Sequence, residues 1–117
     1  MNDRLRDRFR FRCFDNDIQK FVVGFRLCDH YKWPNGIIEQ CTGLKDKNGK
    51  LIYEGDILSF GPKFKPFVTR WDNRYACFFA GKDPLHYSVE CLDKAYEVDG
   101  VEVIGNIHEH GGLLNEN

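Results

Sequence analysis

The fold is decided by one stretch of sequence, which reads Thr42-Gly43-Leu44-Lys45-Asp46-Lys47-Asn48-Gly49-Lys50 and continues Leu-Ile-Tyr-Glu-Gly-Asp-Ile over residues 51–57. Asn48-Gly49 lies between two apolar runs, and an Asn-Gly pair readily adopts the positive φ angles of a tight hairpin turn. This predicts antiparallel strands over residues 37–44 and 51–60. Gly55-Asp56 interrupts the second run, and a glycine there indicates a bulge or bend of the kind found where small barrels turn a corner.

Short strands are also expected on both sides of this hairpin. Arginine occupies every second position of residues 4–12, a period of two that predicts a strand, and Asp15-Asn16-Asp17 would turn it into a second strand over residues 18–27. Residues 67–71 and 75–80 predict another hairpin, and residues 85–91, 95–98 and 101–108 predict extended segments. Turn residues recur at a spacing of about 8 to 12 positions, which is typical of an all-β chain.

The size and composition are those of one globular domain. The chain has 117 residues, of which 42% are hydrophobic and 30% charged, and its 10 Phe, 5 Tyr and 2 Trp can fill a core. The apolar runs over residues 21–25 and 76–81 are too short for a membrane span or a secretion signal. We therefore expect a soluble, cytoplasmic protein.

The cysteine pattern favours buried, reduced thiols. The count is odd, no C-x-x-C pair occurs, and most of these residues have apolar or aromatic neighbours, so a disulfide framework or a zinc ribbon is not expected. The five positions are Cys13, Cys28, Cys41, Cys77 and Cys91.

Charge is distributed unevenly although the formal net charge is −1. Residues 1–82 contain 16 Lys and Arg against 10 Asp and Glu, whereas residues 83–117 contain 1 against 8. If residues 4–12 form a strand, its arginines line one face at about 7 Å spacing, which suits phosphate groups on a nucleic acid. The alternative is that carboxylates of neighbouring strands or of another subunit pair with them. These arginines are Arg4, Arg6, Arg8, Arg10 and Arg12.

The lysines of the central stretch allow two interpretations. Lys45, Lys47 and Lys50 could present a loop to an anion, but every residue there also has a backbone reason to be present, and we favour a purely structural hairpin. A calcium loop is excluded because the twelfth position counted from Asp46 is Ile57 rather than a bidentate glutamate.

No metal, cofactor or catalytic site is expected. Cys28-x-His30 and His108-x-His110 could each place two ligands on one strand face, but a site needs three or four ligands, and nothing links His86 to either pair. The few Ser and Thr residues do not lie in a nucleophile motif, so we expect a protein that is not an enzyme, and the sequence identifies no small-molecule substrate.

The two tryptophans could form an aromatic platform for bases or for a proline-rich peptide. Trp71 precedes Asp72 and Trp33 precedes Pro34. We favour core positions for both, with Trp33 partly exposed because its neighbours are polar.

Beyond these patterns, the stretch from Gln40 to Asp56 resembles the central signature of the YopX family of phage and prophage proteins. The segment Phe11-Arg12-Cys13-Phe14-Asp15 is similar to the Phe-Arg-Ala-Trp-Asp strand of that family, with Cys13 and Phe14 in place of Ala and Trp. Residues 68–73 and 103–109 resemble its later motifs, so the resemblance spans about residues 9–114. The motif positions are Thr42, Gly43, Leu44, Asn48, Gly49, Gly55, Asp56, Trp71, Gly105 and Asn106.

The resemblance implies a mainly β protein of phage or prophage origin, with an N-terminal hairpin region over residues 1–38 and an SH3-like small barrel over residues 39–117, within one domain. It implies no activity, because SH3-like barrels host unrelated functions.

Two functional hypotheses follow. The first is a non-enzymatic accessory protein that self-associates through its charge asymmetry, pairing Arg4, Arg6, Arg8 and Arg10 with Glu97, Asp99, Glu102 and Glu109 of another subunit. The second is a nucleic-acid-binding module whose arginine strand is extended by Lys45, Lys47, Lys50, Lys63 and Lys65. A peptide-binding SH3-like module is a third, weaker reading.

Overall fold

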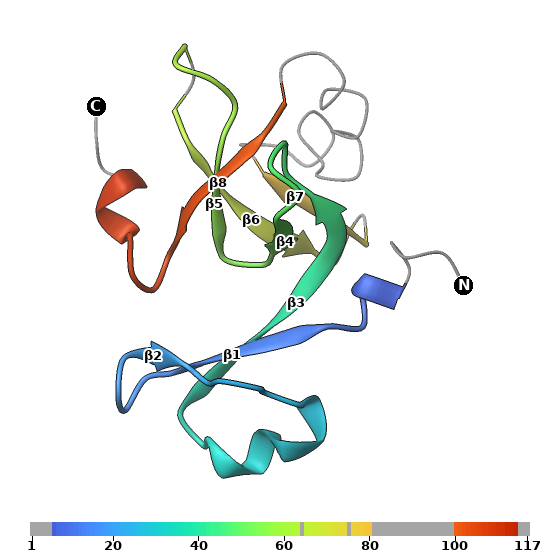
Figure 1. Cartoon of the computed structure of the whole chain (residues 1–117), viewed down its shortest axis with the longest axis vertical. Coiled ribbons are helices and arrows are strands. Elements are labelled where there is room, and N and C mark those ends of the chain that lie inside the picture. The colour runs from blue at the N-terminus through green and yellow to red at the C-terminus, as the bar shows by residue number, and fades with distance from the viewer. Residues whose placement is uncertain (1–5, 64, 75, 81–99, 115–117) are drawn as a thin grey trace.

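One long strand connects the two parts of the molecule. The computed structural model describes residues 6–63, 65–74, 76–80 and 100–114. Strand β3 (Gly36–Lys45) pairs through its first half with β1 (Phe11–Asp15) and through its second half with β4 (Leu51–Tyr53). Strand β2 (Lys20–Phe21) pairs with β1, so this sheet has the order β2-β1-β3-β4. Figure 1 shows β1, β2 and the start of β3 at one end of the molecule.

A second four-stranded antiparallel sheet lies at the other end (Figure 1). Its order is β7 (Cys77–Ala80), β6 (Phe67–Asp72), β5 (Asp56–Ser59) and β8 (Glu102–Asn106). The described helical elements are a turn at residues 6–7 and the two 3-10 helices η1 (Leu27–Lys32) and η2 (Gly111–Leu114). No helix among the described residues is long and apolar enough to cross a membrane.

The central hairpin forms where the sequence predicts it. Gly49 has a φ of +82° in the turn between β3 and β4, and Gly55 has a φ of +84° in the bend that separates β4 from β5. Both angles lie in the left-handed region, which glycine adopts without a steric penalty. The chain is therefore mainly β, as expected, with an N-terminal hairpin and a small half-barrel after it.

The main core lies within the half-barrel. Six buried apolar side chains form it, and Phe60, Phe67 and Val103 pack against it. The six are Leu44, Ile52, Leu58, Phe78, Ala80 and Val101. The part of the chain over residues 10–40, called the N-terminal lobe below, buries far less: Cys13 and Phe14 are its buried apolar side chains.

The predicted arginine strand is wrong in its bounds. Residues 6–7 are helical and β1 begins only at Phe11, because Phe9 N donates to Arg6 O and Arg10 N donates to Asp7 O. These local hydrogen bonds replace a cross-strand ladder. Of the five arginines, Arg12 lies in β1, and Arg4 lies outside the described residues.

The second strand of the N-terminal hairpin is also shorter than predicted. In place of residues 18–27, β2 covers only Lys20–Phe21, and the chain turns away at Gly24, whose φ is +67°. The later hairpin of β6 and β7 is confirmed by the pairing of Asp72 with Cys77. The predicted extended segments over residues 85–91 and 95–98 lie outside the part that the structure describes.

Two interpretations of core residues need correction. Cys13 and Cys41 are buried free thiols, but Cys28 is exposed and Cys77 is half-buried. Trp71 is exposed on β6, where its indole Nε1 donates to Asn73 Oδ1 at 2.7 Å, while one edge packs against Phe78. A residue near a strand end can satisfy its polar atom at the surface in this way. Trp33 is half-buried.

Candidate functional site

Arg12 joins three strands through its guanidinium group. Its Nε donates to Glu39 Oε1 at 2.9 Å, its Nη2 donates to the backbone oxygen of Glu54 at 2.9 Å, and its Nη1 lies 2.8 Å from Asp56 Oδ1. The rings of Phe21 and Tyr53 lie 4.8 and 4.9 Å from its guanidinium carbon. Cation–π contacts of this kind add to the ion pairs. The side chain thus links β1 to β3 and β5.

His108 completes this group from the far end of the chain. Its Nε2 lies 3.1 Å from Glu39 Oε2, and its ring stacks on Phe14 with centroids 4.4 Å apart. Asn106 holds the turn, because its Oδ1 accepts hydrogen bonds from the backbone N–H groups of His108 and Glu109. We call Arg12, Glu39, Asp56 and His108 the junction cluster, since it connects the N-terminal lobe to the half-barrel.

Burial controls the protonation of the two carboxylates in the junction cluster. Desolvation raises the pKa of Glu39 and that of Asp56, and the charge of Arg12 opposes the rise at both. A buried carboxylate without a partner would be strongly destabilising. The charge of Arg12 therefore favours the ionised form of both groups, against the larger effect of burial on each pKa.

Two glycines allow the close approach of the segments around this cluster. A Cβ on Gly55 would collide with the carboxylate of Glu39, and a Cβ on Gly105 would lie 2.7 Å from the ring of His110. The motif positions Gly55, Asp56, Gly105 and Asn106 thus meet in space although 50 residues separate the outer two in the chain. A pocket of about 500 Å³ lies beside them, lined in part by Tyr53 and Glu109.

Among the described residues, the predicted arginines have separate partners in the structure. Arg10 Nε lies 3.0 Å from Asp7 Oδ1, whereas Arg12 belongs to the junction cluster. Arg8 has its guanidinium carbon 5.8 Å from the centre of the Phe78 ring. Arg6 lies in the helical turn. The expectation of a continuous arginine-lined strand is therefore wrong, because the chain is not extended before Phe11.

The central hairpin is held by a residue that sequence reasoning missed. Asp46 Oδ1 accepts from the backbone N–H groups of Asn48 and Lys50, and its Oδ2 accepts from that of Val103, each at 2.9 Å. An aspartate two residues before an Asn-Gly turn is a signal of this role, because its side chain can bond the turn backbone. The hydroxyl of Thr42 donates to the backbone oxygen of Ile52 and accepts from the backbone N–H of Leu44.

The lysines considered as an alternative anion site, and those of the next loop, are all exposed. Lys47 Nζ lies 3.1 Å from Glu102 Oε2. A lysine of the nucleic-acid hypothesis thus pairs within the chain with a glutamate of the self-association hypothesis. Glu109 accepts from Asn106 Nδ2. Glu97 and Asp99 lie outside the described residues. The exposed lysines are Lys45, Lys47, Lys50, Lys63 and Lys65.

The two proposed chelating pairs are not on strands. Cys28 and His30 lie in η1, and His108 and His110 lie after β8 with different partners, Glu39 and the backbone N–H of Asn106. Within the described ranges, no three His, Cys, Asp or Glu side chains are arranged to hold a metal ion. His86 lies outside those ranges.

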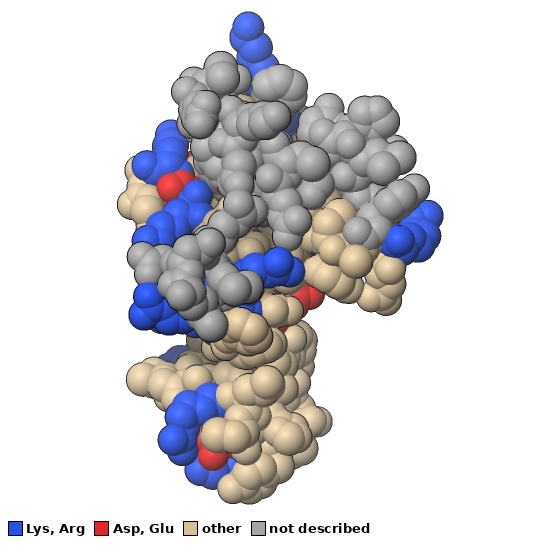
Figure 2. Space-filling model, turned by 90° about the vertical axis from the view of Figure 1, so that its right-hand side faces the viewer, with Lys and Arg blue, Asp and Glu red and all other residues tan. Residues whose placement is uncertain are grey.

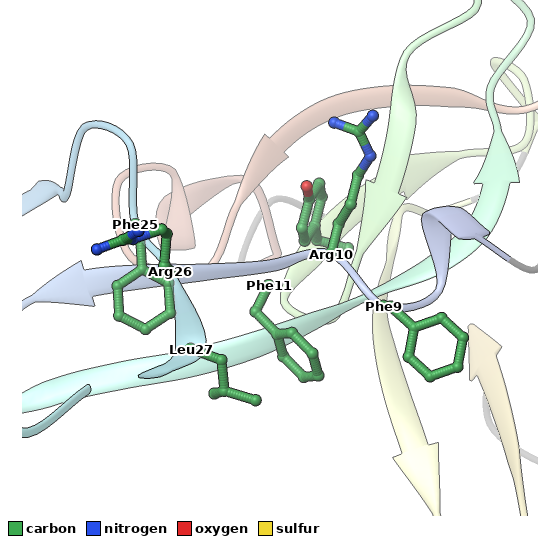
Figure 3. Close-up of a pocket in the computed structure, with 7 residues that line it drawn as sticks. Phe9, Arg10, Phe11, Phe25, Arg26 and Leu27 are labelled. Carbon is green, nitrogen blue, oxygen red and sulfur yellow. The ribbon is translucent and has the colours of Figure 1, made fainter. Parts of the chain in front are cut away.

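A groove of about 550 Å³ opens beside β1. Figure 3 shows the side chains of Phe11 and Leu27 on the same side of this strand, with Arg10 on the opposite side. Phe9 and Leu27 are exposed, and Phe11 and Phe25 are half-buried. The lining is completed by Arg26 and Tyr53.

Exposed apolar side chains concentrate on the N-terminal lobe. Nine large apolar side chains are exposed among the described residues, and six of them lie between residues 10 and 40. Figure 2 shows this lobe at the lower end of the molecule, largely in tan with a group of basic side chains. Its exposed apolar residues are Ile18, Val23, Leu27, Tyr31, Ile37 and Ile38.

Comparison with known proteins identifies a matching family model and a similar solved structure. The family model described as YopX protein matches residues 10–115. The crystal structure of protein EF1440 from Enterococcus faecalis is similar, with a TM-score of 0.65 and 28% sequence identity over 90% of this chain and 96% of that one. The search of curated proteins gives no match.

Proposed function

The chain belongs to the YopX protein family, and from that premise we propose that it is a phage or prophage accessory protein that acts in the bacterial cytoplasm through protein contacts. Self-association is the first of these contacts, and no enzymatic reaction is part of the proposal. The observation that supports it is the exposed apolar surface of the N-terminal lobe.

So much exposed apolar surface is unusual for a lobe that contacts no other protein. Val23 is 98% exposed, and Tyr31, Ile37 and Ile38 add further apolar area on the same lobe. Large exposed apolar patches mark contact surfaces on soluble proteins. Because the lobe has few buried apolar side chains of its own, covering this surface would also stabilise it.

Arginine and acidic residues provide the expected electrostatic part of the contact. Arg6 and Arg8 lie directly before the lobe and Arg10 is its first residue, whereas residues 83–117 hold eight acidic residues against one basic residue. Opposite charges on the two halves favour head-to-tail pairing of copies, which can close into a ring. Added salt should weaken such pairing.

Size-exclusion chromatography with light scattering tests this proposal, with absorbance at 260 nm recorded beside 280 nm. We expect a nucleic-acid-free oligomer for the native chain and a lower mass for the double variant Val23→Glu with Tyr31→Glu. The matched control is Ile107→Glu, which places the same charge at an exposed apolar position outside the lobe. A native monomer, or an oligomer that survives the double variant, would contradict the proposal.

The arginine contribution needs its own variant. Reversing charge in Arg6→Glu with Arg8→Glu should lower the mass further as salt is reduced, because like charges then oppose each other across the contact. Full retention of the oligomer by this variant would remove the electrostatic part and leave the apolar surface as the contact.

Nucleic-acid binding is the second candidate function. Five exposed lysines, Lys45, Lys47, Lys50, Lys63 and Lys65, favour it, whereas the net charge of −1 and the sequence pI near 6.4 do not. Binding to DNA or RNA whose affinity falls steeply with salt would support it. Absence of binding at low salt would eliminate it.

A further inference from the structure

We propose that the groove beside β1, lined by Phe9, Phe11, Phe25 and Leu27, receives the net-acidic segment of residues 83–99 from a second copy of this chain. This inference rests on the self-association of the proposed function and adds to it the docking site and the segment that fills it. It is carried by an open strand edge, exposed guanidinium groups and charge complementarity.

The edge of β1 beside Phe11 is not covered by β2. Arg10 O accepts from Cys41 N on the β3 side, and Cys13 O accepts from Val22 N on the β2 side. Backbone groups alternate between the two neighbours of an antiparallel strand, so those of Phe11 point to the same side as those of Cys13. The pairing of β2 with β1 ends before Gly24, whose φ is +67°, and residues 25–27 line the groove together with Phe9 and Phe11.

An open edge next to an apolar groove is the geometry in which an extended peptide adds to a sheet. Backbone hydrogen bonds then give affinity, and alternate side chains enter the groove. Figure 3 shows Phe11 and Leu27 facing one side of β1, where such side chains would lie.

The arginines at the groove offer donors to acidic residues. Arg10 is 60% exposed while its partner Asp7 is 12% exposed, and Arg26 is 73% exposed while Asp29 is 17% exposed. Each gives only its Nε to that partner among the described residues. Arg26 therefore keeps exposed terminal nitrogens beside the groove, in the fork geometry that binds carboxylates, whereas Arg10 lies on the opposite side of β1 from Phe11 (Figure 3).

Residues 83–99 have the matching chemistry. They contain five acidic residues and one lysine, with Leu85, Tyr87 and Val89 at alternate positions. Alternating apolar side chains are what an added strand would place on the groove face. The five acidic residues are Asp83, Glu90, Asp93, Glu97 and Asp99.

The test uses a fluorescein-labelled synthetic peptide of residues 83–99, titrated with the full-length protein under reducing conditions and followed by fluorescence anisotropy. We expect saturable binding that weakens with salt, and we expect excess unlabelled peptide to lower the oligomer mass. Arg26→Glu and Leu27→Glu should each weaken binding by about tenfold or more. The matched control Lys63→Glu reverses an exposed charge away from the groove and should leave binding within about twofold.

The outcomes separate the groove from self-association. No peptide binding by a protein that remains an oligomer would overturn the groove assignment and leave the proposed function standing, whereas a monomer that binds no peptide would overturn both. Equal binding of a scrambled peptide of the same composition would also overturn it. So would binding of an oligothymidine that Leu27→Glu abolishes, because the groove would then be a nucleic-acid site.

Discussion

Arg12 is the residue on which the junction between the lobe and the half-barrel depends. It is the guanidinium that faces both Glu39 and Asp56, and both carboxylates are buried. Replacing it in Arg12→Met keeps the length of the stem and leaves two buried charges without their cation. We expect a loss of about 3–5 kcal/mol in the free energy of unfolding.

Urea denaturation followed by tryptophan fluorescence measures this loss, and Arg10→Met is its control. Arg10 also pairs with one aspartate, Asp7, but the Arg10 side chain is 60% exposed, and we expect its loss to cost only about 1 kcal/mol. Equal losses for the two variants would show that the junction cluster does not stabilise the fold.

The same variant should respond to pH in a defined direction. Burial raises the pKa of Glu39 and of Asp56 above their unfolded values of 4.5 and 3.8. The folded state therefore binds protons at a higher pH than the unfolded chain, and ionisation of these groups lowers stability as the pH rises through the folded pKa. Without Arg12 this penalty grows. The stability difference between native protein and Arg12→Met should thus shrink between about pH 7 and about pH 4.

Two glycines with nearly equal φ angles allow the cost of backbone strain to be measured separately from the cost of a steric collision. Gly49 and Gly55 have φ angles of +82° and +84°, but a Cβ at Gly49 meets open space and one at Gly55 meets Glu39. Gly49→Ala should cost about 1 kcal/mol from the left-handed angle. Gly55→Ala should cost at least about 2 kcal/mol more because Glu39 must leave Arg12. Thermal unfolding compares them, and equal midpoints would exclude the collision.

At the level of elements, the positions of the turns could be predicted from the sequence, whereas the lengths of the strands could not. Asn48-Gly49 and Gly55-Asp56 set their turns through local φ angles, which neighbouring residues specify. The alternation of residues 4–12 hid the helical spacing of Asp7 and Arg10, three positions apart, whose ion pair accompanies the helical turn. The junction cluster could not be predicted, because it joins residues 12, 39, 56 and 108 through pairings that no local pattern encodes.

The loop between β3 and β4 depends on the carboxylate of Asp46. It accepts three backbone hydrogen bonds, one of them from Val103 in β8. Asp46→Ala leaves these donors unpaired and should lower stability by about 2–4 kcal/mol. The control is Asn48→Ala in the same turn, an exposed position. Chemical denaturation distinguishes them, and a loss at Asp46 no larger than at Asn48 would show that solvent replaces these bonds.

For the whole molecule, stability is expected to be uneven. Six buried apolar side chains form the cluster of the half-barrel, whereas the N-terminal lobe buries Cys13 and Phe14 and exposes six large apolar side chains. Local opening follows the density of buried contacts. Amides of β1 and β2 should therefore exchange with deuterium faster than those of β5, by about tenfold or more in dilute protein.

Concentration adds the decisive part of this experiment. A contact that covers the lobe stabilises it by mass action, so exchange in β1 and β2 should slow as protein concentration rises, while exchange in β5 should stay constant. The variant Val23→Glu with Tyr31→Glu should remove that dependence without changing β5. If concentration slows exchange in β5 and leaves β1 and β2 unchanged, copies meet through the half-barrel, and the exposed apolar surface of the lobe has another purpose.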